Sequence, residues 1–349
     1  MKVVVFGPEK RTGVLRDEKV VDISLACAKY LKERQNEQHP RDLAYVMVPP
    51  DLARLIEGGA RALELAQKSL DYLFGEAHDQ QGILGEKLVY PAGEVILHAP
   101  LPQGARIACA GGNFVDHTVA MLKRRPDPSV KPFEGDPATH IRNTGIWGFW
   151  KVTREMVAPG GDLVYPSRCK RLDYEGELAV IVGKGGKDIR AKDVKDYVWG
   201  VTLLGDWSIR GITEPGPLRF GIQKNFDGCC SLGPAIVVGE CDPSNVQVET
   251  YVNGERRQNF NTRDMVFSFG DYLEFLSRDM TFYPGDIISG GTAAGTAADS
   301  SPLLPDGTPS PEYFLKPGDV VEVRSALVGT LRARVRAKEG APQSSIATA

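Results

Sequence analysis

Residues 173–182 of the chain read DYEGELAVIV, two glutamates followed by an unbroken apolar run. The run predicts a buried β-strand, in which alternate residues point to the same face. Glu175 and Glu177 therefore project side by side where that face begins. Two adjacent carboxylates repel each other unless a cation or a proton neutralises one of them. The stretch indicates either a solvated strand end or a site that holds positive charge.

Similar short β-branched runs, bounded by Gly, Pro and Asp, continue from residue 107 onward. They predict strands at 178–182, 197–204, 235–238, 246–252, 286–289, 320–323 and 331–335, with one helix at 270–278. Glycine (38 residues) and proline (24) supply the turns that such an arrangement needs. This spacing favours a sandwich or barrel of β-strands with few helices.

The first hundred residues have a different texture. Short strands at 3–6, 13–15 and 19–23 precede two helical patterns, one from Ile23 to Leu31 and one over 52–74. Prolines at 91, 100 and 102 then mark a linker. We therefore predict a mainly β protein with α (α+β): a small N-terminal α/β domain at 1–100, a main domain at 101–340, and a disordered tail at 341–349.

Composition excludes several classes of protein. The net charge of the 349 residues is −3, so no basic field points to nucleic acid or to an anionic membrane. No apolar run is long enough for a membrane span or a signal peptide. The six cysteines contain no C-x-x-C pair and read as reduced thiols, which predicts a cytoplasmic protein.

A third carboxylate follows another apolar strand. Residues 198–204 end at Gly205-Asp206, which delivers Asp206 into a loop. Three oxygen donors without paired His or Cys suit a hard cation, Mg²⁺ first, with Mn²⁺ or Ca²⁺ as alternatives. Spacing alone does not establish that Glu175, Glu177 and Asp206 converge.

From residue 107 to about 338 the sequence resembles the fumarylacetoacetate hydrolase family, because several family motifs occur in the family's order. These are GNFVDH (112–117), DYEGELA (173–179), DWSIR (206–210), KNFD (224–227), GP (233–234), NGE (253–255) with Gln258, Thr262 and Met265, and MTFYPGDIISGGT (280–292). The leading domain is similar to the N-terminal domain of many members.

The resemblance implies a catalytic domain of rolled mixed β-sheets or a β-barrel, usually in a homodimer. It implies that Glu175, Glu177 and Asp206 ligate the metal. The other site residues that it implies are His117 as the base that activates water, Lys224 and Arg210 at the substrate's oxo or carboxylate oxygens, Lys151 near the pocket, and the backbone at Gly291 and Thr292.

Such a site predicts a hydrolase that acts on carbon–carbon bonds of ketonic substances. The substrate would be an acylpyruvate-like or other β-dicarbonyl acid, cleaved through a metal-bound enolate. Lys224 suits an oxygen that becomes negative, and Arg210 suits a planar carboxylate. Two alternatives stay open: a metal-dependent 2-oxo acid decarboxylase, tautomerase or dehydratase, and a non-catalytic binding protein of the same fold.

The chain departs from the family pattern beside the proposed base. Ala120 stands where many members carry an acid that orients the histidine, which favours the reactions that need no activated water. An insertion at 293–314 offers three replacement acids: Asp299, Asp306 and Glu312. The segment 117–150 is either a lid or a plain surface loop, in which His140 or Arg142 would reach substrate on closure. Its aromatic residues Trp147, Phe149 and Trp150 predict an apolar wall for a bulkier or aromatic substituent.

Overall fold

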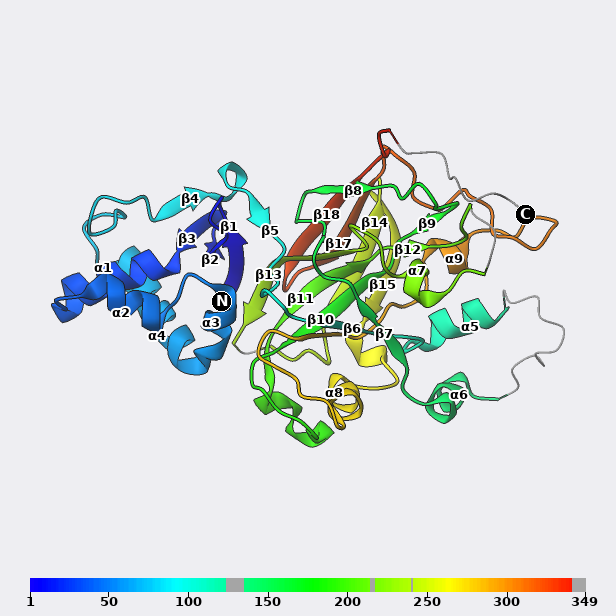
Figure 1. Ribbon diagram of the computed structural model, residues 1–349, viewed down its shortest axis with the longest axis horizontal. Helices are drawn as coiled ribbons and strands as arrows, with labels where there is room; N and C mark the ends of the chain where they lie inside the picture. The colour runs from blue at the N-terminus through cyan, green and yellow to red at the C-terminus, as the bar shows by residue number, and fades with distance from the viewer. Residues whose placement is uncertain (124–134, 214–216, 240, 341–349) are drawn as a thin grey trace.

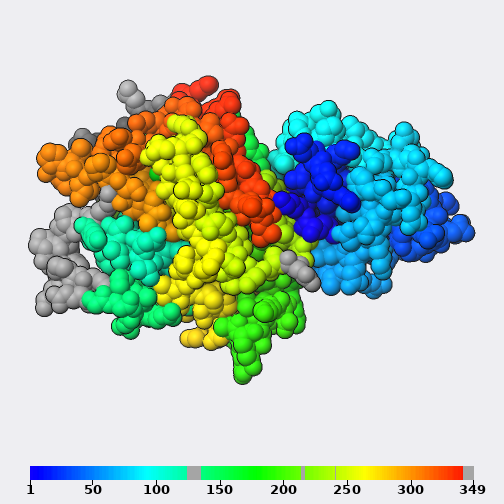
Figure 2. All heavy atoms as spheres, turned by 180° about the vertical axis from the view of Figure 1, so that it is seen from behind, coloured from blue at the N-terminus to red at the C-terminus, as the bar shows by residue number. Residues whose placement is uncertain are grey.

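The computed structural model describes residues 1–123, 135–213, 217–239 and 241–340. The first hundred residues form a smaller lobe beside the larger remainder of the chain (Figures 1 and 2). Both lobes combine sheets with helices, so the predicted fold class is confirmed. The predicted tail, residues 341–349, lies outside the described residues. The described part of the chain contains no helix of the length and apolarity that a membrane span requires.

The smaller lobe packs helices on an antiparallel sheet. Its elements up to residue 75 are β1 (Lys2–Phe6), β2 (Arg11–Arg16), β3 (Lys19–Asp22), α1 (Ile23–Gln35), α2 (Pro40–Met47), α3 (Leu52–Glu57) and α4 (Gly59–Gly75). The single helix predicted over 52–74 is two helices, because the backbone at Gly59 has φ +54°, which glycine tolerates at little cost. Helix α2 was not predicted.

The two lobes share one continuous sheet, since β1 pairs antiparallel with a strand of the larger lobe. The sheet runs in the order β4 (Val89–Pro91), β3, β2, β1, β13 (Cys230–Val238), β11 (Val198–Asp206), β10 (Gly176–Val182), β16 (Ile287–Ser289), β6 (Ile107–Ala110), β7 (Gly148–Lys151), with β5 (Leu97–His98) beside β1. The stretch predicted as a linker thus contains β5 and the end of β4.

Two further sheets complete the larger lobe. One runs β15 (Glu255–Asn261), β14 (Gln247–Val252), β17 (Val320–Ser325), β18 (Gly329–Arg336), β8 (Asp162–Val164), and the other pairs β12 (Ser208–Ile209) with β9 (Leu172–Asp173). The sheets approach closely at Gly176, where a Cβ would lie 2.1 Å from Thr250 Oγ1. Strand β10 is buried along its whole length between β11 and β16, which explains its unbroken apolar run.

Short helices that the sequence analysis did not predict gather at one end of the larger lobe (Figure 1). They are α5 (Val115–Lys123), α6 (Pro137–Thr144), α7 (Phe220–Gln223) and α9 (Ala297–Ser300). The larger lobe also contains the predicted α8 (Phe269–Ser277) and 3₁₀ turns at Ala191–Asp196 and Thr262–Asp264, and a further 3₁₀ turn lies at Ala92–Glu94 in the smaller lobe. Helix α6 shows the physical reason: it is only eight residues long, too short for a clear periodicity, and begins with Asp136 as N-cap and Pro137 in its first turn. Part of the 117–150 segment, residues 124–134, lies outside the described residues.

Candidate active site

The three predicted carboxylates come together. Glu175 precedes β10, Glu177 lies within it, and Asp206 ends the neighbouring strand β11. One oxygen from each lies within 4.8 Å of the others, and all three residues are buried. Oxygen ligands of one Mg²⁺, bound at about 2.1 Å, lie roughly 3–4 Å apart, so the cluster has the donor type and dimensions of a hard-cation site.

Two lysines and an arginine neutralise most of this charge. Lys224 Nζ lies 2.5 Å from Glu175 Oε2 and 2.8 Å from Asp206 Oδ2, and Lys151 Nζ lies 2.6 Å from the other oxygen of Asp206. Arg210 donates to Glu175 and, from Nε at 2.9 Å, to Asp173. Burial lowers the pKa of Lys224, but Asp206 and Glu175 raise it more, so it stays an ammonium. We call Glu175, Glu177, Asp206 and these three cations the carboxylate floor.

Glu177 is the carboxylate of the floor that stays uncompensated. It accepts a hydrogen bond from Ser289 but makes no ion pair with any described residue. Burial, and then the charges of Asp206 and Glu175, raise the pKa of Glu177 well above its ordinary value. At Glu175 the lysine and arginine outweigh burial, and its pKa is lowered. The floor therefore favours an added positive charge beside Glu177, and its oxygen donors fit a divalent cation.

His117 has a buried acidic partner. Its Nδ1 lies 2.8 Å from Oδ2 of Asp299, one of the three acids that the sequence offered. Asp306 instead bonds to Thr308, and Glu312 is exposed. The other oxygen of Asp299 accepts from the Gly295 amide at 3.0 Å. An aspartate at Nδ1 fixes the imidazole tautomer and leaves Nε2 as the acceptor nitrogen.

Asp173 links the two groups, a role that the sequence analysis missed. Asp173 is two residues before Glu175, as Glu175 is before Glu177, and this alternation could have predicted that Asp173 faces the same site. Besides Arg210, it accepts the Ala297 amide at 2.7 Å and the Ala298 amide at 3.2 Å, at the start of α9. Burial is the main cause that raises the pKa of Asp173 to about 6. Asp173, at the end of β9, thus ties the segment that leads into β10 to the helix of Asp299.

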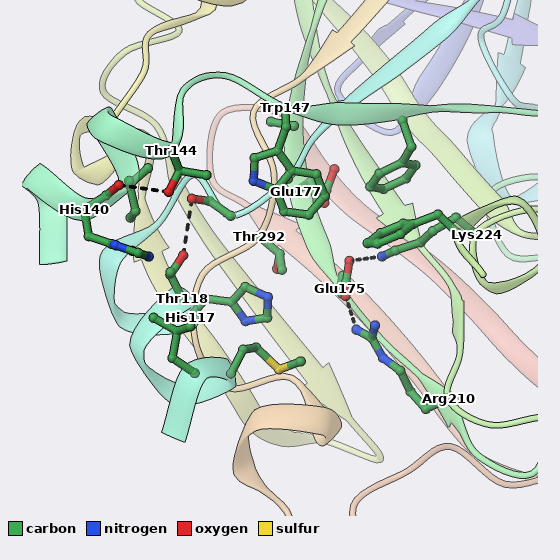
Figure 3. Close-up of a pocket in the computed structure, with 18 residues that line it drawn as sticks. His117, Thr118, His140, Thr144, Trp147, Glu175, Glu177, Arg210, Lys224 and Thr292 are labelled. Carbon is green, nitrogen blue, oxygen red and sulfur yellow. Dashed lines mark hydrogen bonds and ion pairs between the residues drawn. The ribbon is translucent and has the colours of Figure 1, made fainter. Parts of the chain in front are cut away.

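A cavity of about 370 Å³ joins His117 and the carboxylate floor. Figure 3 shows Lys224 and Arg210 meeting Glu175 on one side of it, with His117 opposite and Trp147 across the space. Helices α5, α6, α7 and α9, with the residues between α6 and β7, form what we call the helical side. The apolar residues that line the cavity from this side and from β7 are Met121, Leu122, Ile141, Trp147, Phe149 and Phe220. The sequence had indicated Trp147 and Phe149 but not Phe220.

Of three residues that the family resemblance implies for substrate binding, Thr292 lines the cavity, whereas Gly291 and Lys151 do not. Thr292 lines the cavity, donates to the Gly176 carbonyl and accepts from Gln258. Gly291, with φ +84°, precedes it and is not among the lining residues. Lys151 is fully buried behind Asp206 and does not line the cavity, because its ammonium is held by that carboxylate. Trp150, the third predicted wall residue, also does not line the cavity. The Arg106 guanidinium lies over its ring, with Cζ 5.7 Å from the ring centre.

The chain is similar to known proteins in sequence and in fold. The family model described as fumarylacetoacetate (FAA) hydrolase C-terminal matches residues 106–336, about two thirds of the chain. The chain belongs to the fumarylacetoacetate hydrolase family. The resemblance seen in the sequence motifs is therefore confirmed.

Curated members of this family that the chain resembles include tautomerases. The oxaloacetate tautomerase YisK of Bacillus subtilis is 31% identical over 324 residues, covering 91% of this chain and 93% of the relative. The mitochondrial oxaloacetate tautomerase Fahd2a of Rattus norvegicus is 30% identical over 286 residues, covering 81% and 79%. Among solved structures, maleylpyruvate hydrolase from Sphingobium sp. SYK-6, in complex with manganese(II) ion and pyruvate, matches with a TM-score of 0.64 at 23% identity, over 97% of this chain and all of that one.

Proposed function

We propose that this protein is a divalent-metal-dependent enzyme that interconverts the keto and enol forms of a 2-oxo acid of the oxaloacetate type. One observation carries the proposal: a single cavity sets an oriented His117–Asp299 pair opposite a carboxylate floor that contains Lys224 and Arg210. Tautomerisation needs a group that moves a proton and charges that stabilise an enolate oxygen. The tautomerase activity of the two curated relatives supports this choice.

Glu175, Glu177 and Asp206 would hold the metal, for which we propose Mg²⁺, with Mn²⁺ as the alternative. When bound, a divalent cation supplies Lewis acidity toward the 2-oxo group. Its charge would also compensate Glu177, the acidic group that the lysines and Arg210 leave unpaired.

Lys224, Arg210 and Thr292 would position the substrate, because all three line the cavity. Lys224 presents an ammonium where the 2-oxo oxygen becomes negative. Arg210 keeps guanidinium donors beyond those used by Asp173 and Glu175, and these suit a carboxylate. Lys151, behind Asp206, would position that carboxylate rather than touch substrate.

His117 would carry the proton between carbon and oxygen. Its Nε2 takes the proton from C3, and the C–H electron pair forms the C2–C3 double bond as the π pair of the 2-oxo group moves onto its oxygen. The imidazolium then gives the proton to that oxygen. The reverse sequence converts the enol to the ketone. Asp299 stabilises the imidazolium that forms between the two transfers.

The test is a ketonisation assay. Oxaloacetate added in its enol form loses its enol absorbance spontaneously, and the Mg²⁺-loaded protein should accelerate this loss, whereas EDTA should abolish the acceleration. In D₂O the enzyme should also speed exchange at C3. Acceleration without metal sensitivity, or no acceleration in the presence of Mg²⁺ and Mn²⁺, would contradict the proposal.

Hydrolysis of a carbon–carbon bond in an acylpyruvate is the second candidate. The observation that favours it is Asp299, which supplies the acidic partner that Ala120 does not and gives His117 the orientation that a water-activating base requires. Mass spectrometry of acylpyruvate reactions in H₂¹⁸O separates the two functions. Cleavage gives two fragments, one with ¹⁸O, while tautomerisation leaves the carbon skeleton intact. The homodimer and the cytoplasmic location stay predictions.

A further inference from the structure

Three aromatic side chains form one face of the cavity. The rings of Trp147 and Phe220 meet edge to face with centroids 5.6 Å apart, and Phe149 lies 5.6 Å from Phe220 at 33°. We call Trp147, Phe149 and Phe220 the aromatic wall. The three residues come from the α6–β7 connection, β7 and α7, so the wall is a product of tertiary packing.

Trp147 lies flat against a pair of glycines. A Cβ at Gly111 would lie 2.5 Å from the indole ring, and a Cβ at Gly112 would lie 3.3 Å from its Nε1. The indole therefore occupies space that any other residue at 111 would fill. This close approach holds the Trp147 ring as a wall of the cavity (Figure 3).

The aromatic wall adjoins the charged end of the cavity. Lys224 follows α7 directly, and its backbone amide bonds to the Phe220 carbonyl at 3.0 Å. Lys224 Nζ also lies 4.9 Å from the centre of the Phe149 ring. Phe149 and Phe220 therefore lie within reach of the remaining atoms of a substrate whose oxygen contacts Lys224.

Much of this aromatic surface is uncovered. Trp147 is 41% exposed and Phe220 is 45% exposed, whereas large aromatic residues bury readily in a folded protein. The cavity of about 370 Å³ lies within the range of about 300–1,000 Å³ that is usual for sites of drug-sized ligands, so it has room for a substituent. The two described lining residues that are lysine or arginine, Arg210 and Lys224, both belong to the floor. Of the two titratable side chains on α6, His140 and Arg142, His140 is the one that lines the cavity.

We infer that, among the 2-oxo acids on which the site acts, those whose end remote from the oxo-acid group is apolar and planar, such as an aryl group, bind more tightly than dicarboxylates such as oxaloacetate. This inference rests on the proposed function for the placement of the oxo-acid group. The aromatic wall then selects the substituent, because rings stack on rings and the three residues of the wall offer no cation to a second carboxylate. Apolar pockets discriminate by about 10–200-fold for a group as small as one methylene, so the preference is measurable.

The test is a binding series that requires no turnover. Oxamate, N-phenyloxamate, N-cyclohexyloxamate and N-(carboxymethyl)oxamate share one 2-oxo-acid-like head, do not enolise, and differ in their substituent. Calorimetry with the full-length Mg²⁺-loaded protein should give at least tenfold tighter binding for the phenyl compound than for oxamate or the carboxymethyl compound. The cyclohexyl compound should fall between them.

Substitutions locate the preference. Phe220→Ala should reduce the phenyl-to-oxamate affinity ratio at least fivefold, and Trp147→Phe should reduce it by a smaller factor. Phe275→Ala is the matched control, because Phe275 is 44% exposed on α8 and does not line this cavity; its ratio should stay within twofold of the unaltered protein. If Phe220→Ala does not fold, Trp147→Phe carries the test.

Equal affinities for the four compounds, or the reverse order of affinities, would overturn the inference. So would tightest binding of the carboxymethyl compound, if the His140→Ala variant no longer bound it tightly. Failure of all four compounds to bind overturns it as well. The expected ranking without any turnover of 2-oxo acids would support the inference and contradict the proposed tautomerase function, so the two outcomes are separable.

Discussion

The carboxylate floor and the helical side of the pocket hold their side chains in different ways. Asp206 and Glu177 are 0% and 1% exposed, on strands paired on both sides, and each cation of the floor has a fixed carboxylate partner. Trp147 and Phe220 are 41% and 45% exposed, on short helices and connections. Charged side chains on paired strands are positioned precisely. The sequence of exposed segments, in contrast, can change at little cost to the stability of the fold. The floor thus suits the chemistry shared by the family, and the helical side suits the choice of reaction and substrate.

The largest effect is expected at the floor from Glu177→Gln. It should abolish calorimetric Mn²⁺ binding and turnover, since a metal supplies several kcal/mol of transition-state stabilisation. It should not lower the melting temperature of the metal-free protein, because burial already disfavours the charged form of Glu177 and a glutamine can still accept the hydrogen bond from Ser289. Glu312→Gln, at an exposed site, is the control. Retained metal binding in Glu177→Gln would refute the assignment of the floor as a metal site.

Lys151→Met should destabilise the fold most strongly, in contrast with Glu177→Gln. It leaves one oxygen of buried Asp206 without its ion pair, at a cost of about 3–5 kcal/mol of unfolding free energy. Urea unfolding of the metal-free protein measures this cost. Arg336→Met, which breaks an exposed pair with Asp162, should cost at most about 1 kcal/mol. Equal costs for the two variants would mean that the floor is not a low-dielectric environment.

On the helical side, Asp299→Asn should lower turnover by about 10²–10⁴-fold while Mn²⁺ affinity stays within about twofold. The reason is that Asp299 orients His117 and contacts no residue of the floor among its hydrogen bonds. His117→Gln combined with Asp299→Asn should be no worse than His117→Gln alone, because the pair acts as one unit. Asp306→Asn, exposed in the same insertion, serves as the control. Additive losses would show that the two residues act separately.

The smallest of the activity effects is expected from Asp173→Asn, which weakens the link between the two sides. A loss of about 10–100-fold in turnover is typical of a residue that orients a ligand or base through another group. Because Asp173 contacts both Arg210 and the start of α9, the variant should alter Mn²⁺ affinity and the His117-dependent rate together. Asp162→Asn on the surface is the comparison. A change in only the Mn²⁺ affinity, or only the His117-dependent rate, would argue that Asp173 does not link the carboxylate floor to the helical side.

The sequence by itself determined the family, the strand framework and the composition of the floor. The apolar runs after Glu175 and before Asp206 predict buried strands, and neighbouring buried strands bring their ends together. The motifs identify Lys224, Arg210 and His117 as site residues because their order along the chain is retained, although their roles stay proposals. The alternating acidic residues at 173, 175 and 177 could also have predicted that Asp173 belongs to the site.

Only the tertiary structure decided which residues meet across long stretches of chain. His117 and Asp299 are 182 positions apart, and nothing local distinguishes Asp299 from Asp306 or Glu312. Phe220 joins Trp147 and Phe149 through packing of separate elements, and Lys151 lies behind Asp206 because β7 and β11 belong to one sheet. Periodicity reports which face of an element is buried, whereas contacts between elements depend on the sum of packing over the whole chain.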